Sequence, residues 1–214
     1  MASDPATAAP GNATAHVAVL LAPHVVAPGE SIVVRLLGSV GPNGSWSLET
    51  VAVRRQGTSV ELVPHVRRVP GDLFTQMVVP LDVSVGFVAF AALCEVRAIG
   101  CDSTLVVHLQ VRKHARRSPP RVRIRAESPV AIGAEAAVPV VIEATSTDGW
   151  VERLEIRNGA HWMPPDSVER DGSTLQARTM VRRPPHDGPR RIEARAIDGQ
   201  GQRSRRVVLT LPGR

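Results

Sequence analysis

The chain has 214 residues and a formal net charge of +6, and its apolar residues are mainly Val, Ala, Leu and Ile, with three Phe, three Trp and no Tyr. β-Branched residues together with 18 Pro and 17 Gly indicate many short strands separated by turns, which predicts an all-β fold. No stretch has the roughly 20 apolar residues that span a bilayer, and no nucleophile elbow, zinc-protease motif or phosphate loop is present, so we expect neither a membrane-spanning segment nor an enzyme.

The chain begins with a polar segment, residues 1–14, which we expect to form a flexible arm. This segment has neither the basic nor the hydrophobic region of a signal peptide, so either a signal has been removed or the protein is assembled inside a cell. A first domain, residues 15–112, then shows segments of strand length, separated by turns rich in Gly, Pro or Asn. The predicted strands are 16–21, 31–37, 47–55, 59–66, 73–79, 87–98 and 104–112.

Residues 113–120 form the predicted linker, because the consecutive prolines Pro119 and Pro120 cannot extend a β-ladder and prefer an extended, semi-rigid conformation. A second domain, residues 121–214, again shows about seven predicted strands in the same order. These strands are 121–126, 136–144, 151–157, a short piece near 161–162, 174–181, 190–196 and 205–211. About seven short strands in each domain predict two β-sandwiches.

An internal repeat supports this division. Glu-Val-Arg-Ala-Ile-Gly at residues 95–100 returns as Glu-Ala-Arg-Ala-Ile-Asp at residues 193–198, which is 98 residues later. Each copy is followed by a loop and an alternating apolar run. Upstream, Trp46 and Trp150 each precede a strand-like segment and occupy equivalent corners. A spacing near 100 residues is the size of a domain and not of a solenoid repeat.

Residues 120–214 resemble the bacterial immunoglobulin-like module. The resemblance rests on four segments in the expected order: Pro-Arg-Val-Arg-Ile at 120–124, Ser-Pro-Val-Ala-Ile-Gly at 128–133, Ala-Thr-Ser-Thr-Asp-Gly-Trp-Val at 144–151 and Glu-Ala-Arg-Ala-Ile-Asp-Gly-Gln-Gly at 193–201. Residues 15–112 resemble the family more weakly, mainly through the repeat. The sequence lacks the Tyr or Phe usual near residues 190–192 and the Cys–Trp–Cys pattern of antibody domains. The resemblance implies two tandem immunoglobulin-like β-sandwiches.

Cys94 and Cys101 are the only cysteines, and two interpretations of them remain open. They could form a disulfide if a hairpin brings their Cα atoms within about 7 Å, which would indicate an oxidising compartment. Cys94 could instead be a buried core thiol, because it follows Ala91-Ala92-Leu93. Two cysteines alone cannot make a zinc site, and no histidine pairs with another at ligand spacing.

The net charge comes from the second half of the chain. Residues 1–114 carry eight basic and eight acidic side chains, whereas residues 115–214 carry 18 Arg against 12 acids. Alternation in the strand 121–126 places three guanidinium groups on one face, close to arginines of the linker and of the last strand. Together they predict a basic stripe that binds phosphate or carboxylate groups. Its residues are Arg116, Arg117, Arg121, Arg123, Arg125, Arg203 and Arg205. Alternatively, the arginines only protect an edge strand against aggregation.

Two further pairs of residues are candidate contact sites. Asp148 and Asp198 lie in loops and are weak calcium candidates, because Ca²⁺ needs six to eight oxygen ligands and Asp is also an ordinary turn residue. We therefore expect no metal and no cofactor. Trp162 and Met163 stand beside prolines and would contact a partner if exposed, or plug the core if buried.

The leading hypothesis is a non-enzymatic structural or interaction module, adhesive or assembling, of a bacterial cell surface, periplasm or secreted assembly. Its partner would be another protein or further copies of the chain, and no small-molecule substrate is expected. One alternative is a structural or decoration protein of a phage virion or injection machine. The second is an anion-binding module that recognises acidic polysaccharide or nucleic acid through the arginines of the second domain.

Overall fold

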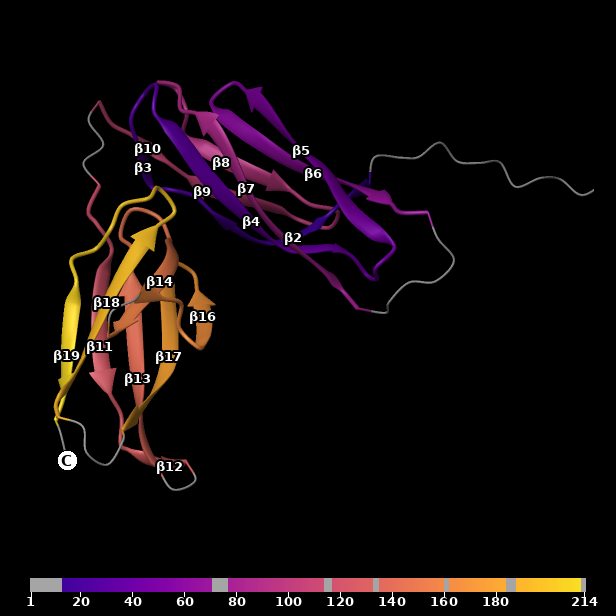
Figure 1. Cartoon of the computed structure of the whole chain (residues 1–214). Helices are drawn as coiled ribbons and strands as arrows, with labels where there is room; N and C mark the ends of the chain where they lie inside the picture. The colour runs from indigo at the N-terminus through magenta and orange to yellow at the C-terminus, as the bar shows by residue number, and fades with distance from the viewer. Residues whose placement is uncertain are drawn as a thin grey trace, which may run out of the picture. The chain divides into compact units, whose positions relative to one another are not determined.

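The computed structural model describes residues 13–70, 77–113, 117–132, 135–159, 162–183 and 188–212. Every element of regular structure among these residues is a β-strand, and the strands form open sheets, which confirms the predicted all-β class (Figure 1). Within the same residues, no helix is long and apolar enough to cross a membrane. The chain divides into two compact units, the first containing residues up to Lys113 except Pro23–Val25, and the second containing Pro23–Val25 and the residues from His114 onward.

The first unit is built from two main sheets and one small sheet. Its strands are β1 (Ala13–Thr14), β2 (His16–Leu21), β3 (Val25–Val26), β4 (Ser31–Gly41), β5 (Trp46–Gln56), β6 (Ser59–Arg68), β7 (Val79–Val88), β8 (Glu95–Ile99), β9 (Thr104–His108) and β10 (Gln110–Val111). One main sheet has the order β2-β4-β7, and the other has the order β1-β6-β8-β9 with β5 paired to β6. β3 pairs with β10, and β6 and β8 run parallel to each other.

Alternating apolar residues fill the core of this unit. Ile32, Val34 and Leu36 of β4 are fully buried, and the residues between them are more accessible. Val96 and Ala98 of β8, in the other main sheet, are buried in the same cluster. Removing such side chains from water stabilises the fold by about 1.5–3 kcal/mol each, so the two sheets hold together through this shared layer.

The second unit has two antiparallel sheets. Its strands are β11 (Arg121–Ala126), β12 (Val130–Ile132), β13 (Glu135–Thr145), β14 (Val151–Asn158), β15 (Trp162–Met163), β16 (Ser167–Asp171), β17 (Thr174–Arg183), β18 (Arg190–Asp198) and β19 (Val207–Leu211). One sheet has the order β11-β13-β17-β16 with β12 paired to β13, and the other has the order β15-β14-β18-β19. A separate core joins the sheets, with Val140 and Ile142 from one packed against Ile156 and Ile192 from the other. This arrangement is consistent with a β-sandwich.

Some predicted strands differ from those observed. The predicted strand 87–98 covers only the last two residues of β7 and all of β8, and the residues between them form a connection, while residues 80–86 of β7 were not predicted as strand. Ala89 and Leu93 of this connection are buried, so the run is apolar although it lies outside the strands. The predicted strand 73–79 falls mainly outside the described residues.

Three further strands, β1, β12 and β16, also differ from the prediction. β12 and β16 were not predicted, because their residues are mostly exposed and carry no apolar alternation. Ala13 and Thr14, which the sequence places in a flexible arm, form β1 and pair with β6. The predicted arm is therefore two residues too long, and the rest of it lies outside the described residues.

The internal repeat is kept only in part. The two copies of its closing motif form β8 and β18, and each pairs with the strand that follows it. The upstream match is not kept, because Trp46 begins β5, which has β6 as its one partner among the described strands, whereas Trp150 precedes β14, which lies between β15 and β18. Alternation determines which face of a strand is buried but not which strand lies beside it, so the sequence match could not reveal this difference.

Candidate functional site

The predicted arginine row lies on β11. Arg121, Arg123 and Arg125 are exposed, while Val122 and Ile124 pack against the core, as the alternation predicts. β11 is an edge strand of its sheet and lies beside β19 of the opposite sheet (Figure 1).

The remaining arginines of the predicted stripe lie outside β11. Arg203 and Arg205 precede β19 and are exposed. Arg117 is half-buried, and Arg116 lies outside the described residues. The structure therefore places β11, which carries the three alternating arginines, next to β19, which follows Arg203 and Arg205.

Five of the predicted arginines differ from several others in the same unit in having no carboxylate partner among the described residues. None of Arg121, Arg123, Arg125, Arg203 and Arg205 forms an ion pair with any acidic side chain that the structure describes. Glu143 lies directly opposite Arg123 in the β11–β13 register and is exposed, but the two side chains do not pair. We call Arg121, Arg123 and Arg125 the β11 arginine row.

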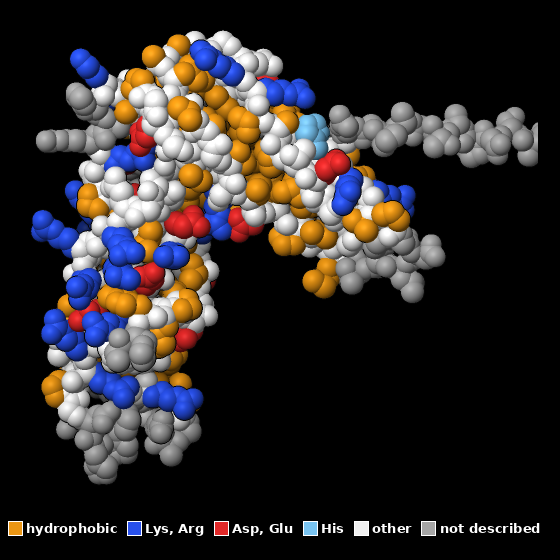
Figure 2. Space-filling view, turned by 45° about the horizontal axis from the view of Figure 1, so that its top comes forward, with side chains coloured by type: hydrophobic (Ala, Val, Ile, Leu, Met, Phe, Trp, Pro, Cys, Tyr) orange, Lys and Arg blue, Asp and Glu red, His pale blue; other side chains and the backbone are white. Residues whose placement is uncertain are grey.

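The arginines on the outer face of β14 and β18, by contrast, have carboxylate partners, although five described arginines in this region share only Glu155 and Glu193. Arg195 Nε lies 2.6 Å from Glu155 Oε2, and Arg157 Nη1 lies 3.7 Å from Glu193 Oε2. Figure 2 shows basic side chains gathered over the second unit. Described arginines without a carboxylate partner thus lie on β11 and before β19, and Arg182 of β17 is a further one.

Asp148 and Asp198 serve local turns. The carboxylate of Asp198 is buried and accepts the backbone N–H groups of Gln200 and Gln202, at 2.9 and 2.8 Å from Oδ1. The carboxylate of Asp148 accepts the backbone N–H of Ser118. Neither aspartate belongs to a group of three or more metal-ligating side chains among the described residues. The turn interpretation therefore accounts for both.

Trp162 is neither a core plug nor an open aromatic surface. It lies half-buried in β15, at the edge of its sheet, and the guanidinium of Arg195 lies 4.1 Å from the centroid of its ring. This cation–π contact covers one face of the indole. Met163 beside it is 47% exposed, so it is the more accessible of the predicted contact pair.

The two cysteines are not bonded to each other. Both are free and exposed, which contradicts both the disulfide and the buried core thiol. They lie at opposite ends of β8, and a strand of five residues spans about 16 Å, at roughly 3.3 Å per residue. The disulfide prediction assumed that the cysteines flank a hairpin turn, whereas they flank a strand.

The structure brings together three side chains that the sequence analysis did not combine. His16 Nδ1 lies 2.9 Å from both carboxylate oxygens of Asp102, and the thiol of Cys101 lies 3.7 Å from Asp102 Oδ1. One potential ligand atom from each residue lies within 4.8 Å of the others. Within the described ranges this is the single group of at least three His, Cys, Asp or Glu side chains with that spacing. We call it the His16 cluster.

Backbone contacts hold the two halves of the His16 cluster together. The turn between β8 and β9 docks on the start of β2, where Cys101 N–H donates to the carbonyl oxygen of Ala15 at 3.1 Å. Gly100 N–H closes the turn by donating to Ser103 O at 2.8 Å. A Cβ atom on Gly100 would lie 3.1 Å from Ala15 O, so this close approach favours glycine.

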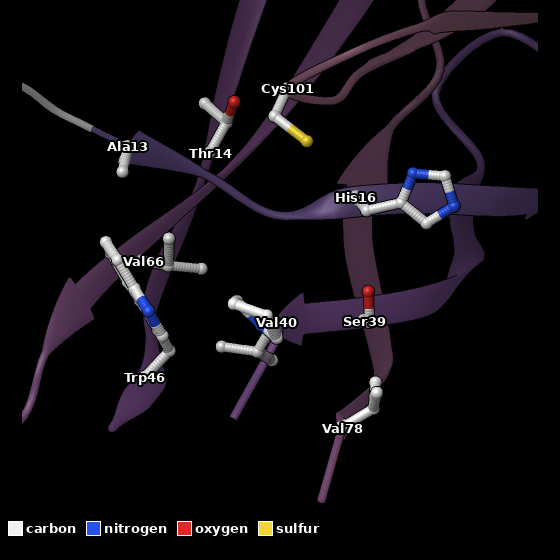
Figure 3. A pocket seen from close by; sticks show the side chains of 11 residues that line it. Ala13, Thr14, His16, Ser39, Val40, Trp46, Val66, Val78 and Cys101 are labelled. Atoms are coloured by element: carbon white, nitrogen blue, oxygen red, sulfur yellow. The ribbon is translucent and has the colours of Figure 1, made fainter. Parts of the chain in front are cut away.

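An apolar pocket of about 320 Å³ lies beside the cluster. His16 and Cys101 line it together with Val40, Trp46, Val66 and Val78. Figure 3 shows the sulfur of Cys101 turned toward the side on which the His16 ring lies. The indole of Trp46 packs on the backbone of Gly41, where a Cβ atom would lie 2.5 Å from the ring.

The charges of the cluster suit a hydrogen-bonded thiol rather than a thiolate. The hydrogen bond from His16 lowers the pKa of Asp102. Partial desolvation, followed by the negative charge of Asp102, raises the pKa of the Cys101 thiol. A thiol with a raised pKa stays protonated at neutral pH and is a poor nucleophile. The Nδ1 atom of His16 faces the carboxylate, so this is not the arrangement of an activated cysteine and its base.

No protein-family model matches the chain, and no curated protein matches it. The immunoglobulin-like resemblance of residues 120–214 therefore stays a prediction from the sequence.

Proposed function

We propose that the protein is a non-enzymatic interaction module of a bacterial cell-surface, periplasmic or secreted assembly, and that its second unit binds an acidic polysaccharide. The sheet orders β11-β13-β17-β16 and β15-β14-β18-β19 support an immunoglobulin-like second unit, since that fold divides strands A, B, E, D and C, F, G between two sheets. The first unit supports this assignment less, because β6 and β8 run parallel.

The observation that carries the proposal is the β11 arginine row without carboxylate partners. Alternate residues of a strand lie about 7 Å apart, which is within the Debye length of about 8 Å at physiological ionic strength. The three guanidinium groups therefore repel one another in the free protein. An anionic chain laid along β11 would relieve this repulsion, and the planar guanidinium can form paired hydrogen bonds with carboxylate or sulfate groups.

The aromatic residues favour a polysaccharide over a nucleic acid. Nucleic-acid surfaces usually add aromatic side chains on which bases stack. Residues 114–214 contain only Trp150 and Trp162 as Trp, Tyr or Phe. Trp150 is 2% exposed, and Arg195 covers the ring of Trp162. Neither provides a stacking surface beside the β11 arginine row.

The test is binding of the full chain to heparin, used as a sulfated polysaccharide probe, at several salt concentrations. We expect binding that weakens as salt rises, and a loss of about tenfold or more in affinity in the Arg121/Arg123/Arg125→Ala variant. A matched control removes three exposed arginines of the first unit, Arg54, Arg67 and Arg68, and changes the net charge equally.

Two results would contradict the proposal. Equal losses in the two variants would mean that net charge, and not the β11 arginine row, attracts heparin. Tighter binding of single-stranded DNA than of heparin at the same salt concentration would favour a nucleic-acid ligand instead.

A further inference from the structure

We propose that His16, Cys101 and Asp102 form a binding site for a divalent transition-metal ion of the zinc class. The site lies in the first unit and uses none of the arginines, so it is independent of the function proposed above. It combines imidazole, thiol and carboxylate, one from each residue, at the place where the β8–β9 turn meets β2.

Two of the three ligand-atom spacings are close to those around a zinc ion, and the third, between the His16 and Cys101 ligand atoms, is within 4.8 Å. Zinc binds nitrogen and oxygen at about 2.0–2.2 Å and sulfur at about 2.3 Å, so ligand atoms around a tetrahedral ion lie roughly 3.2–3.8 Å apart. His16 Nδ1 lies 2.9 Å from the oxygens of Asp102, and Cys101 Sγ lies 3.7 Å from one of them. A small opening of the histidine–aspartate hydrogen bond would therefore admit the ion, with water completing the coordination of this exposed site.

The ligand types select the class of metal. Calcium and magnesium prefer sites made only of oxygen atoms. A set with one sulfur and one imidazole nitrogen suits zinc, and also cobalt or nickel, which bind such sets in the laboratory. The oxygen of Asp102 is compatible with zinc and adds the negative charge that balances a divalent ion.

The backbone presents the ligands before any metal is bound. His16 is the first residue of β2 and pairs with Ser39 of β4. The turn that carries Cys101 and Asp102 is tied to β2 through Ala15 O and, by the hydroxyl of Ser103, through Val17 O at 3.4 Å. A bound ion would link two segments 86 residues apart in the sequence. Because the unfolded chain does not hold these ligands together, metal binding should stabilise the first unit.

The experiment uses the untagged full chain in its reduced form. We expect Co²⁺ to bind one per chain with release of the Cys101 thiol proton to solvent, to give a thiolate-to-cobalt charge-transfer band in the near ultraviolet, and to be displaced by Zn²⁺. Loss of even an outer-shell residue around a metal usually reduces affinity by about 10–100-fold, so loss of a direct ligand in Cys101→Ser or Asp102→Asn should reduce the affinity for Zn²⁺ by at least about tenfold. Calorimetric titration measures these affinities.

Matched controls keep the test specific. Cys94→Ser and His108→Asn change exposed residues of the same types outside the cluster and should leave Zn²⁺ affinity unchanged. Zn²⁺ should also protect Cys101, and not Cys94, from alkylation in the unaltered protein, a readout that needs no variant. Zinc binding only at millimolar concentration, absence of the cobalt band, equal protection of the two cysteines or full affinity in Cys101→Ser would each overturn the proposal.

Discussion

Gly38 lets β4 lie against β2 where their pairing is irregular, between Val17 and Val19. A Cβ atom at this position would lie 2.1 Å from the carbonyl oxygen of His16, which belongs to the backbone and cannot rotate away. We expect Gly38→Ala to lower the free energy of unfolding by about 1–3 kcal/mol, the usual cost of an overpacked position. Urea denaturation of the full chain measures this loss.

Gly86 provides the matched control for this substitution. It lies in β7, opposite Val33 of β4, and the nearest atom to an added methyl group would be the carbonyl oxygen of Ile32 at 3.9 Å. Gly86→Ala should therefore be neutral or stabilising by up to about 1 kcal/mol, since alanine reduces the entropy of the unfolded chain. If both substitutions destabilise equally, the close approach of β2 and β4 is not the cause.

The charge of Asp102 should control the reactivity of Cys101. The pKa of this thiol is raised first by partial desolvation and then by the carboxylate of Asp102. Asp102→Asn removes the negative charge, so the thiol pKa should fall and the thiolate fraction near pH 8 should rise. We expect faster alkylation of Cys101 by iodoacetamide in the presence of a chelator, followed by mass spectrometry. The rate at Cys94 is the internal control, and a slower or unchanged rate at Cys101 would contradict the assignment.

Sequence reasoning could find the β11 arginine row but not the His16 cluster. The row follows from the two-residue period of a strand, which is a local property. The cluster joins a strand start to a turn 86 residues later, and only the docking of that turn on β2 brings the side chains together. Adjacent Cys101 and Asp102 were the one visible signal, and nothing local pointed to His16.

Among the elements, some strands with a buried alternating face were predictable, but β7 also alternates and only its two ends fall in predicted strands. β11 matches its predicted range because its alternation continues between two turns, and β2 matches although its pattern is interrupted between Val17 and Val19. The connection between β7 and β8 is apolar because some of its residues are buried. Its sequence therefore resembles a strand, although its backbone is not one. The exposed strands β12 and β16 depend on pairing with β13 and β17, which their own residues do not indicate.

The connection from β18 to β19 depends on Asp198, whose buried carboxylate accepts two backbone N–H groups. We expect Asp198→Ala to lower the free energy of unfolding by about 1–3 kcal/mol, because both donors lose their partner. The exposed Asp171 is the control, and Asp171→Ala should change stability by less than about 0.5 kcal/mol. Thermal unfolding with and without Ca²⁺ completes the test: a rise in melting temperature that needs Asp198 would revive the calcium interpretation.

At the scale of the whole molecule, the two units differ in charge although they share an all-strand design. Basic and acidic residues balance in residues 1–114, whereas residues 115–214 carry the whole excess of arginine. The metal site proposed here lies in the neutral unit and the arginine row in the basic one. If the two units derive from one repeated domain, their surface charges have diverged more than their closing hairpins, β8–β9 and β18–β19.

Each unit has its own hydrophobic core, and this predicts separate responses to core substitutions. Leu36 in the first unit and Ile142 in the second are fully buried, in two clusters that share no residue. Leu36→Ala and Ile142→Ala should each cost about 2–5 kcal/mol in the unit that carries the change. Hydrogen exchange on the full chain, resolved by peptide, should show lower protection within that unit and unchanged protection in the other. The two variants control for each other, and loss of protection in both units from either substitution would mean that the cores do not unfold independently.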